Sequence, residues 1–216
     1  MIYVYAVAEA LRELPELEGI DGAPLARRVI EGLDVVVSEH DAGVEQTDEA
    51  VLAHARVVDG LVTRSTAVLP ARFGHGFRDQ QSLAETIRDR LTSLHNALDQ
   101  VRGCVEVGLR VVGEEPLHSR PAGSGRAYME AAFARHQAAE RLGSEIHDDL
   151  AVLARSSTHT IATAPRLVLS GAYLVELSNV EAFRARVADL AARHPQLAFA
   201  STGPWPPYSF APNGST

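Results

Sequence analysis

The order of predicted elements in the second half of the chain constrains the fold more than any other feature of the sequence. Apolar residues at every second position of 105–111 predict a strand with one exposed face, and an apolar stripe over about residues 126–153 predicts a long helix. The order β-α-β-β-α-β that results is the ferredoxin-like order, in which four antiparallel strands carry both helices on one face. The elements that complete it are two strand-like runs (157–163 and 166–177), a helix between Asn179 and Pro195, and a last strand over 197–202.

A connecting helix is predicted immediately before this half, over about residues 80–102. Its apolar residues recur at intervals of three or four, which makes one continuous helical stripe. Ser82 and Glu85 form a capping-box pattern at its start. Gly103 is expected to end it as a C′ residue.

Residues 1–76 predict a unit of mixed α and β structure. The runs 2–7 and 33–38 are rich in β-branched residues and predict strands. Thr47 is the expected N-cap of a helix. The extended run that ends at Pro70 is expected at a sheet edge or at the end of a strand, because proline cannot donate to a central ladder.

The acidic charge of the chain lies almost wholly in its first part. Residues 1–76 hold 13 acidic and 6 basic side chains, whereas residues 77–216 hold 15 and 14. This shift predicts two domains with different surfaces, an acidic α+β domain over residues 1–76 and a ferredoxin-like domain over residues 77–216. The expected fold class is therefore α+β.

The types of charged residue exclude several functions. The formal net charge is −8 and every basic residue is arginine. The missing lysine excludes a Schiff base and a P-loop, and the acidic balance argues against nucleic acid as a partner. The only cysteine, Cys104, lies in a strand-like run and predicts a buried thiol. Because the sequence contains neither a signal peptide nor an apolar run of about 20 residues, we expect a cytoplasmic protein with no membrane contact.

Two groups of residues invite a metal-binding or catalytic interpretation. His136, Glu140 and His147 have spacings that let them share one helical face, as metal ligands do, although a solvated helix face is the simpler interpretation. His75 lies between two glycines, where a mobile imidazole can act as a general base. The sequence offers it neither an orienting acid nor a nucleophile, so a flexible hinge is the simpler interpretation there.

Two proline-marked hydrophobic segments have no place in these patterns. They are the LPARFG segment (residues 69–74) and the WPPYSF strap (residues 205–210). Proline favours an extended backbone, and rigid aromatic side chains on such a backbone bury well, either on their own domain or on a partner. We expect interaction or packing roles for seven residues: Leu69, Pro70, Arg72, Phe73, Trp205, Tyr208 and Phe210.

Four segments, in order along the chain, resemble the gas vesicle proteins of the F/L type. They are Ile2-Tyr3-Val4-Tyr5, residues 68–74, residues 171–175 and residues 203–210. The LPARFG segment and the WPPYSF strap together carry most of the specificity of this resemblance. One departure is Gly74-His75-Gly76, because the family more often has a small hydroxyl residue after the first glycine.

The resemblance implies a non-enzymatic role in assembling gas vesicles, the gas-filled protein shells that make some prokaryotes buoyant. It implies an α+β N-terminal domain and a C-terminal domain of modified ferredoxin type. The implied partners are the small hydrophobic shell protein and other gas vesicle accessory proteins, at the gas vesicle in the cytoplasm. It implies no catalytic residue, cofactor or metal.

Two alternatives drawn from the residues alone stay open. A ferredoxin-like sheet hosts many ligands, so a small-molecule-binding regulatory module is one of them. The other is a metal-dependent enzyme that uses His136, Glu140 and His147.

Overall fold

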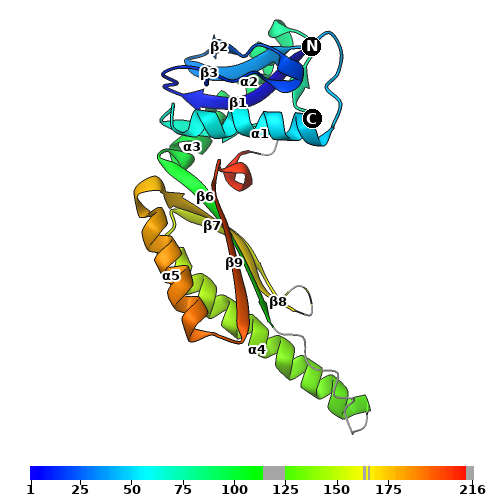
Figure 1. Cartoon of the computed structure of the whole chain (residues 1–216), viewed down its shortest axis with the longest axis vertical. Coiled ribbons are helices and arrows are strands. Elements are labelled where there is room, and N and C mark those ends of the chain that lie inside the picture. Colours follow the sequence, from blue (N-terminus) through cyan, green and yellow to red (C-terminus); the bar gives the residue numbers. More distant parts are fainter. Residues whose placement is uncertain (114–124, 163, 165, 213–216) are drawn as a thin grey trace. The chain divides into compact units, whose positions relative to one another are not determined.

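The chain forms two compact units in the computed structural model, which describes residues 1–113, 125–162, 164 and 166–212 (Figure 1). Unit 1 combines Met1–Val105 with Trp205–Thr216, and unit 2 is Glu106–Pro204. This division differs from the expected boundary between residues 76 and 77. The reason is that the helical segment after residue 77 packs on the first sheet, and the WPPYSF strap returns to the same unit.

Unit 1 is built on a five-stranded antiparallel sheet in the order β2-β3-β1-β4, with β5 also paired to β1. The register of the central strand shifts between Val4 and Ala6, which indicates a bulge at Tyr5. Tyr3 and Tyr5 share one face by the normal alternation of a strand, and the bulge places Ala6 and Ala8 in the same core cluster, while Val4 lines the opposite face of the sheet. The strands are β1 (Ile2–Glu9), β2 (Ala26–Ile30), β3 (Leu33–Glu39), β4 (Ala67–Pro70) and β5 (Gly76–Phe77).

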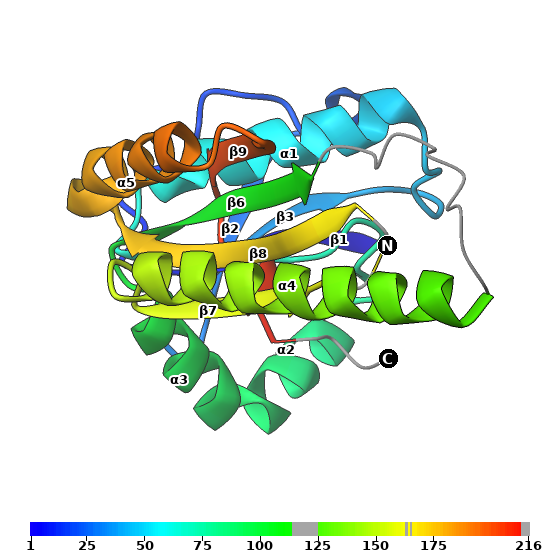
Figure 2. The same ribbon diagram turned by 90° about the horizontal axis from the view of Figure 1, so that it is seen from below.

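Helices cover both faces of this sheet (Figure 2), and every residue of β1 except Glu9 is buried. Helix α1 (Asp48–Val62) packs its buried Val57 and Leu61 into the cluster that contains Tyr3. The predicted N-cap is confirmed, because Oγ1 of Thr47 accepts a hydrogen bond of 3.1 Å from the amide of Ala50.

The connecting segment forms two helices, so the prediction of one helix over about residues 80–102 is wrong. Helices α2 (Gln80–Asp89) and α3 (Leu91–Val101) meet at Arg90, whose φ of −107° and ψ of 9° interrupt the helical backbone. The apolar stripe runs through both helices, but α2 contacts β2 and β5 whereas α3 contacts β4. The break therefore lets each half follow different strands of one sheet.

The ends of this helical pair follow capping rules. Asp79, rather than Ser82, is the N-cap of α2: its carboxylate accepts from the Ser82 amide, and Oγ of Ser82 accepts from the Asp79 amide. Gly103 follows α3 with a φ of +68°, as predicted for a C′ glycine. Cys104 comes next and is buried, as predicted.

Unit 2 confirms the predicted order of elements, in a sheet with the strand order β7-β8-β6-β9. The ring of Tyr173 contacts both His147 of one helix and Phe183 of the other, so both helices lie on the same face of the sheet. Asp149 joins the two helices through ion pairs to Arg186 and Arg193. The elements are β6 (Cys104–Gly113), α4 (Gly125–Ala151), β7 (Ser156–Ile161), β8 (Leu167–Glu176), α5 (Val180–Arg193) and β9 (Leu197–Trp205).

Candidate functional site

The LPARFG segment begins as an edge strand of unit 1. Leu69 pairs with Val7 and Pro70 pairs with Ala6 in the antiparallel ladder between β4 and β1. Pro70 is the last residue of β4, which lies at the edge of the sheet, so the predicted position is confirmed. Leu69 is buried, and its side chain lines the face covered by α2 and α3.

A buried tyrosine–histidine pair holds the rest of the LPARFG segment. Nε2 of His54 lies 3.0 Å from the carbonyl oxygen of Ala71, and a carbonyl only accepts, so Nε2 carries the proton. Nδ1 of His54 therefore accepts from the Tyr3 hydroxyl at 2.9 Å, and the same hydroxyl accepts from the amide of Gly74 at 3.2 Å. Burial lowers the pKa of His54 to about 4, which keeps the imidazole neutral, as this network requires.

Phe73 and Arg72 point in different directions from this segment. The Phe73 ring is half-buried and meets the rings of Tyr3 and His54 edge-on, each with a centroid distance of 5.9 Å. Arg72 is exposed. Gly74 adopts a φ of +85°, a conformation that glycine takes without strain. The segment therefore packs one side chain inward and presents one cation outward.

The WPPYSF strap lies on the same unit. Pro206 and Pro207 are buried, and Tyr208 packs against the core cluster that contains Tyr3. Burial raises the pKa of Tyr208 above its ordinary value, with smaller contributions from the negative charge of Asp59 and from Tyr3. Phe210 ends a short 3-10 helix, η3 (Tyr208–Phe210), that contacts β4. Trp205 remains 48% exposed.

The structure thus brings together two segments that lie more than a hundred residues apart in the sequence. Phe73 of the LPARFG segment and Tyr208 of the WPPYSF strap pack against the same core cluster. They meet around Tyr3 and His54, which are not among the predicted site residues. A signal was present for His54, since it lies one helical turn before the buried Val57 and Val58.

An apolar groove of about 100 Å³ lies where the LPARFG segment faces α2 and α3, and Ala211 and Pro212 also line it. Its floor is aliphatic, and its rim carries Arg72, His75 and Arg90. Burial, and then the charge of Arg90, lower the pKa of His75. The aliphatic residues that line the groove are Val4, Val7, Leu69, Leu83, Ile87 and Leu94.

His75 is fixed at this rim by its own backbone. Its carbonyl oxygen accepts from the Val4 amide at 2.9 Å, and its amide donates to the carbonyl of Arg72 at 3.2 Å. Its ring meets Phe77 edge-on, with a centroid distance of 5.1 Å. These contacts hold the turn between β4 and β5, so the hinge interpretation of His75 finds no support in them.

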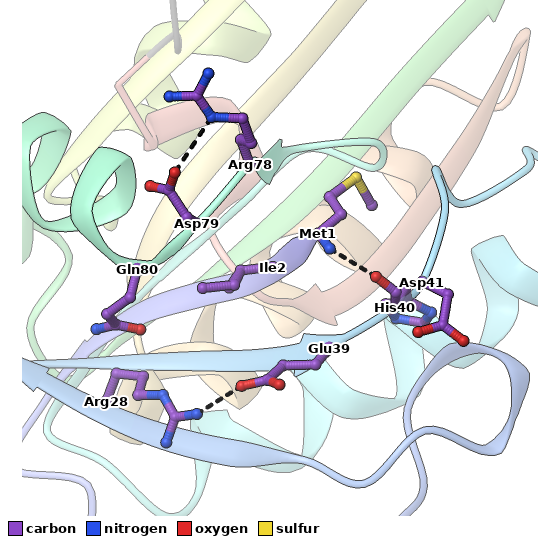
Figure 3. A pocket seen from close by; sticks show the side chains of 9 residues that line it. All are labelled: Met1, Ile2, Arg28, Glu39, His40, Asp41, Arg78, Asp79 and Gln80. Carbon is purple, nitrogen blue, oxygen red and sulfur yellow. Dashed lines mark hydrogen bonds and ion pairs between the residues drawn. The ribbon is translucent and has the colours of Figure 1, made fainter.

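A second hollow of about 630 Å³ opens near the first residues of β1 and is lined mainly by charged side chains (Figure 3). Its lining is more polar than that of the groove beside the LPARFG segment, and several of its charged side chains are paired within the chain. The interactions drawn there join the amino group of Met1 to the carbonyl of His40 at 2.6 Å, Arg28 to Glu39 at 2.8 Å, and Arg78 to Asp79 at 3.2 Å.

The three residues of the metal hypothesis do not come together. His136 and Glu140 form an exposed pair, 3.4 Å apart, on the surface of α4. His147 instead stacks on His159 at a centroid distance of 3.6 Å, and its Nδ1 lies 3.1 Å from the Tyr173 hydroxyl. Within the part of the chain that the structure describes, no three His, Cys, Asp or Glu side chains are arranged to hold a metal ion. Over the same residues, no helix combines the length and the apolar character needed to cross a membrane.

Comparison with known proteins connects this fold to one family. The chain matches the family described as gas vesicle synthesis protein GvpL/GvpF over residues 1–212. It is 28% identical over 214 residues to gas vesicle protein F1 of Halobacterium salinarum, and 30% identical over 217 residues to gas vesicle protein F of Haloferax mediterranei. It is 31% identical over 250 residues to gas vesicle protein L of a Streptomyces species. Each alignment covers 97% of this chain and 92% of the relative.

Solved structures agree on the fold. The crystal structure of gas vesicle protein GvpF from Anabaena sp. PCC7120 matches with a TM-score of 0.81 at 16% identity, over 99% of this chain and 97% of that one. That of GvpF from Microcystis aeruginosa matches with a TM-score of 0.77 at 18% identity, over 97% and 98%. These matches confirm the α+β fold class, and the family match over residues 1–212 confirms the resemblance. The chain belongs to the GvpL/GvpF family of gas vesicle proteins.

Proposed function

We propose that this chain is a non-enzymatic assembly factor that binds the hydrophobic shell protein while gas vesicles form. Membership of the GvpL/GvpF family makes it a protein of gas vesicle formation. We propose in addition that it contacts the shell protein and other accessory proteins, at the gas vesicle in the cytoplasm. It needs no cofactor and no catalytic residue.

The observation that supports this proposal most is the convergence of the LPARFG segment and the WPPYSF strap on unit 1. Their inward side chains, Phe73 and Tyr208, pack on one core cluster. Arg72 and Trp205 stay accessible. An accessible tryptophan and an accessible arginine are the residue types that most often dominate binding energy at protein interfaces.

The groove beside the LPARFG segment favours a protein partner over a small molecule. Its volume of about 100 Å³ is well below the roughly 300–1,000 Å³ typical of small-molecule sites. An aliphatic floor with Arg72 and Arg90 at the rim suits an apolar side chain that has acidic neighbours. We therefore propose that an apolar side chain of the shell protein enters this groove.

Co-purification tests the proposal in cells that express a tagged chain together with the shell protein. We expect Trp205→Ala to reduce the recovered shell protein several-fold, because Trp205 would lose its contact with the partner. Leu177→Ala is the matched control, since Leu177 is 55% exposed in unit 2 and lies outside the proposed surface. Equal recovery of shell protein from Trp205→Ala and from the unmodified chain would contradict the proposal.

A further inference from the structure

The described side chains in the N-terminal half of α4 are exposed or partly exposed. Figures 1 and 2 show it continuing past the strands of unit 2. None of its described side chains between Arg126 and Arg141 is buried. Burial begins at Gly143 and continues at Ile146 and Leu150, on the side of the helix that faces the sheet. The described side chains in the first four turns of α4 therefore lie outside the buried core of their unit.

Two large apolar side chains stand on this exposed half. Met129 and Phe133 lie one turn apart and are 67% and 63% exposed. At about 100° per residue, Phe133 lies roughly 100° around the helix from Leu150, so its direction is not toward the sheet. Arg126 and Glu140 lie close to the same line as Phe133. An exposed stripe of this kind is typical of a helix that packs on another helix.

We propose that this stripe binds α4 of a second copy of the chain, with the two helices antiparallel and the two Phe133 rings in contact. Arg126 and Glu140 lie at equal distances on either side of Phe133, about 10.5 Å along the axis. Antiparallel pairing about Phe133 therefore sets Arg126 of each copy opposite Glu140 of the other, with Met129 packing beside the rings. The charge pattern is thus complementary to itself in this orientation.

The same charges disfavour the parallel alternative. In-register parallel helices would set Arg126 against Arg126 and Glu140 against Glu140, which brings like charges together. Antiparallel packing also opposes the two helix dipoles, which is favourable. Within one chain, Arg126 pairs with Glu130 at 2.8 Å and Glu140 pairs with His136 at 3.4 Å. Both of these pairs are solvent-exposed, so exchanging them for contacts with a second copy costs little.

The size of the surface sets the expected strength of association. Stable protein interfaces bury about 1,600 Å² in total, and one stripe of a single helix supplies less than that. Self-association is therefore weak and depends on concentration, and it becomes important where copies are gathered at one place, such as a growing assembly. This inference concerns unit 2 and does not depend on the proposed contact with the shell protein.

Sedimentation equilibrium over concentrations from micromolar to about 1 mM measures this association. We expect the average mass to rise from 23.2 kDa toward twice that value. Phe133→Asp should weaken dimerisation at least about tenfold, because it places two carboxylates at the centre of the interface. Arg135→Glu, on the opposite side of α4, should leave it unchanged. A mass of 23.2 kDa at every concentration would overturn the proposal.

A charge exchange tests the antiparallel register. Arg126→Glu alone and Glu140→Arg alone should each weaken dimerisation about tenfold, because each sets like charges opposite one another twice per dimer. The double variant Arg126→Glu/Glu140→Arg should restore association to within about threefold of the unmodified chain. Failure of the double variant to restore association, or a dimer insensitive to Phe133→Asp, would overturn the pairing. Circular dichroism of each variant checks that α4 stays folded.

Discussion

The Tyr3 hydroxyl donates to Nδ1 of His54 across 2.9 Å, in a buried hydrogen bond that joins the first strand to α1. The same two side chains bind the backbone of the LPARFG segment, through Ala71 and Gly74. The segment that carries much of the family resemblance is therefore held by two residues distant from it in sequence. Its exposed residues are presented from a fixed backbone.

Tyr3→Phe is expected to loosen the LPARFG segment. The substitution keeps the ring but removes the hydroxyl that bonds to Nδ1 of His54 and to the Gly74 amide. Nδ1 of His54 is then a buried polar atom without a partner, which costs about 2 kcal/mol of unfolding free energy. Thermal unfolding should show this loss, and hydrogen exchange should show faster exchange of the Gly74 amide. Tyr173→Phe, which removes a hydrogen bond to His147 in unit 2, is the control and should leave Gly74 unchanged. Unchanged Gly74 exchange in Tyr3→Phe would refute the assigned network.

Acid should destabilise unit 1 through His54. Burial lowers the pKa of His54 from 6.5 to about 4, so between these values the unfolded chain binds more protons than the folded chain. The stabilisation is fully present above pH 6.5 and is lost as the pH falls toward 4, by an amount on the order of 3 kcal/mol.

His54→Gln removes this titration, and the free energy of unfolding should then depend less steeply on pH within that window. The exposed His95 provides the substitution control, because its side chain lies outside the buried network of Tyr3 and His54. Chemical denaturation at several pH values between 7 and about 4 measures both slopes. Equal slopes for His54→Gln and the unmodified chain would show that His54 is not the responsible group.

The sequence predicts the secondary structure correctly wherever buried apolar residues recur at a regular period. The β-α-β-β-α-β order, the Thr47 cap and the end of the connecting segment at Gly103 all follow from local periodicity and capping, and the structure confirms them. The break at Arg90 was not readable, because the apolar stripe continues through it. Its cause is that α2 and α3 contact different strands, which no local pattern records.

The candidate site was readable only in part. The LPARFG segment and the WPPYSF strap can be recognised from the sequence because they contain proline and aromatic residues and lack the apolar period of a helix or a strand. Tyr3 and His54 cannot be identified in this way, because a tyrosine in a buried strand and a histidine on a helical stripe resemble ordinary core residues. Their role arises from a hydrogen bond between residues 51 positions apart, which depends on the tertiary fold.

Gly143→Ala should weaken the packing of α4 on its sheet. A Cβ at this position would lie 2.6 Å from Cγ2 of Ile161 and 2.6 Å from the carbonyl oxygen of Val168. Alanine normally stabilises a helix relative to glycine by about 1 kcal/mol, but here the overlap should reverse the sign and cost about 1–3 kcal/mol. Gly43→Ala is the control, because nothing lies within 4 Å of its Cβ. Thermal unfolding of both variants measures the difference, and a stabilised Gly143→Ala would contradict this packing.

Photo-crosslinking in cells that form gas vesicles tests the central claim most directly. A photoreactive amino acid replaces either Arg72 or Trp205, which are the accessible residues of the LPARFG segment and the WPPYSF strap. A third variant carries it at Val152, which is 77% exposed in unit 2. We predict crosslinks to the shell protein from positions 72 and 205 and none from position 152. Crosslinks from position 152 alone, or none from positions 72 and 205 while vesicles form, would contradict the proposed binding surface.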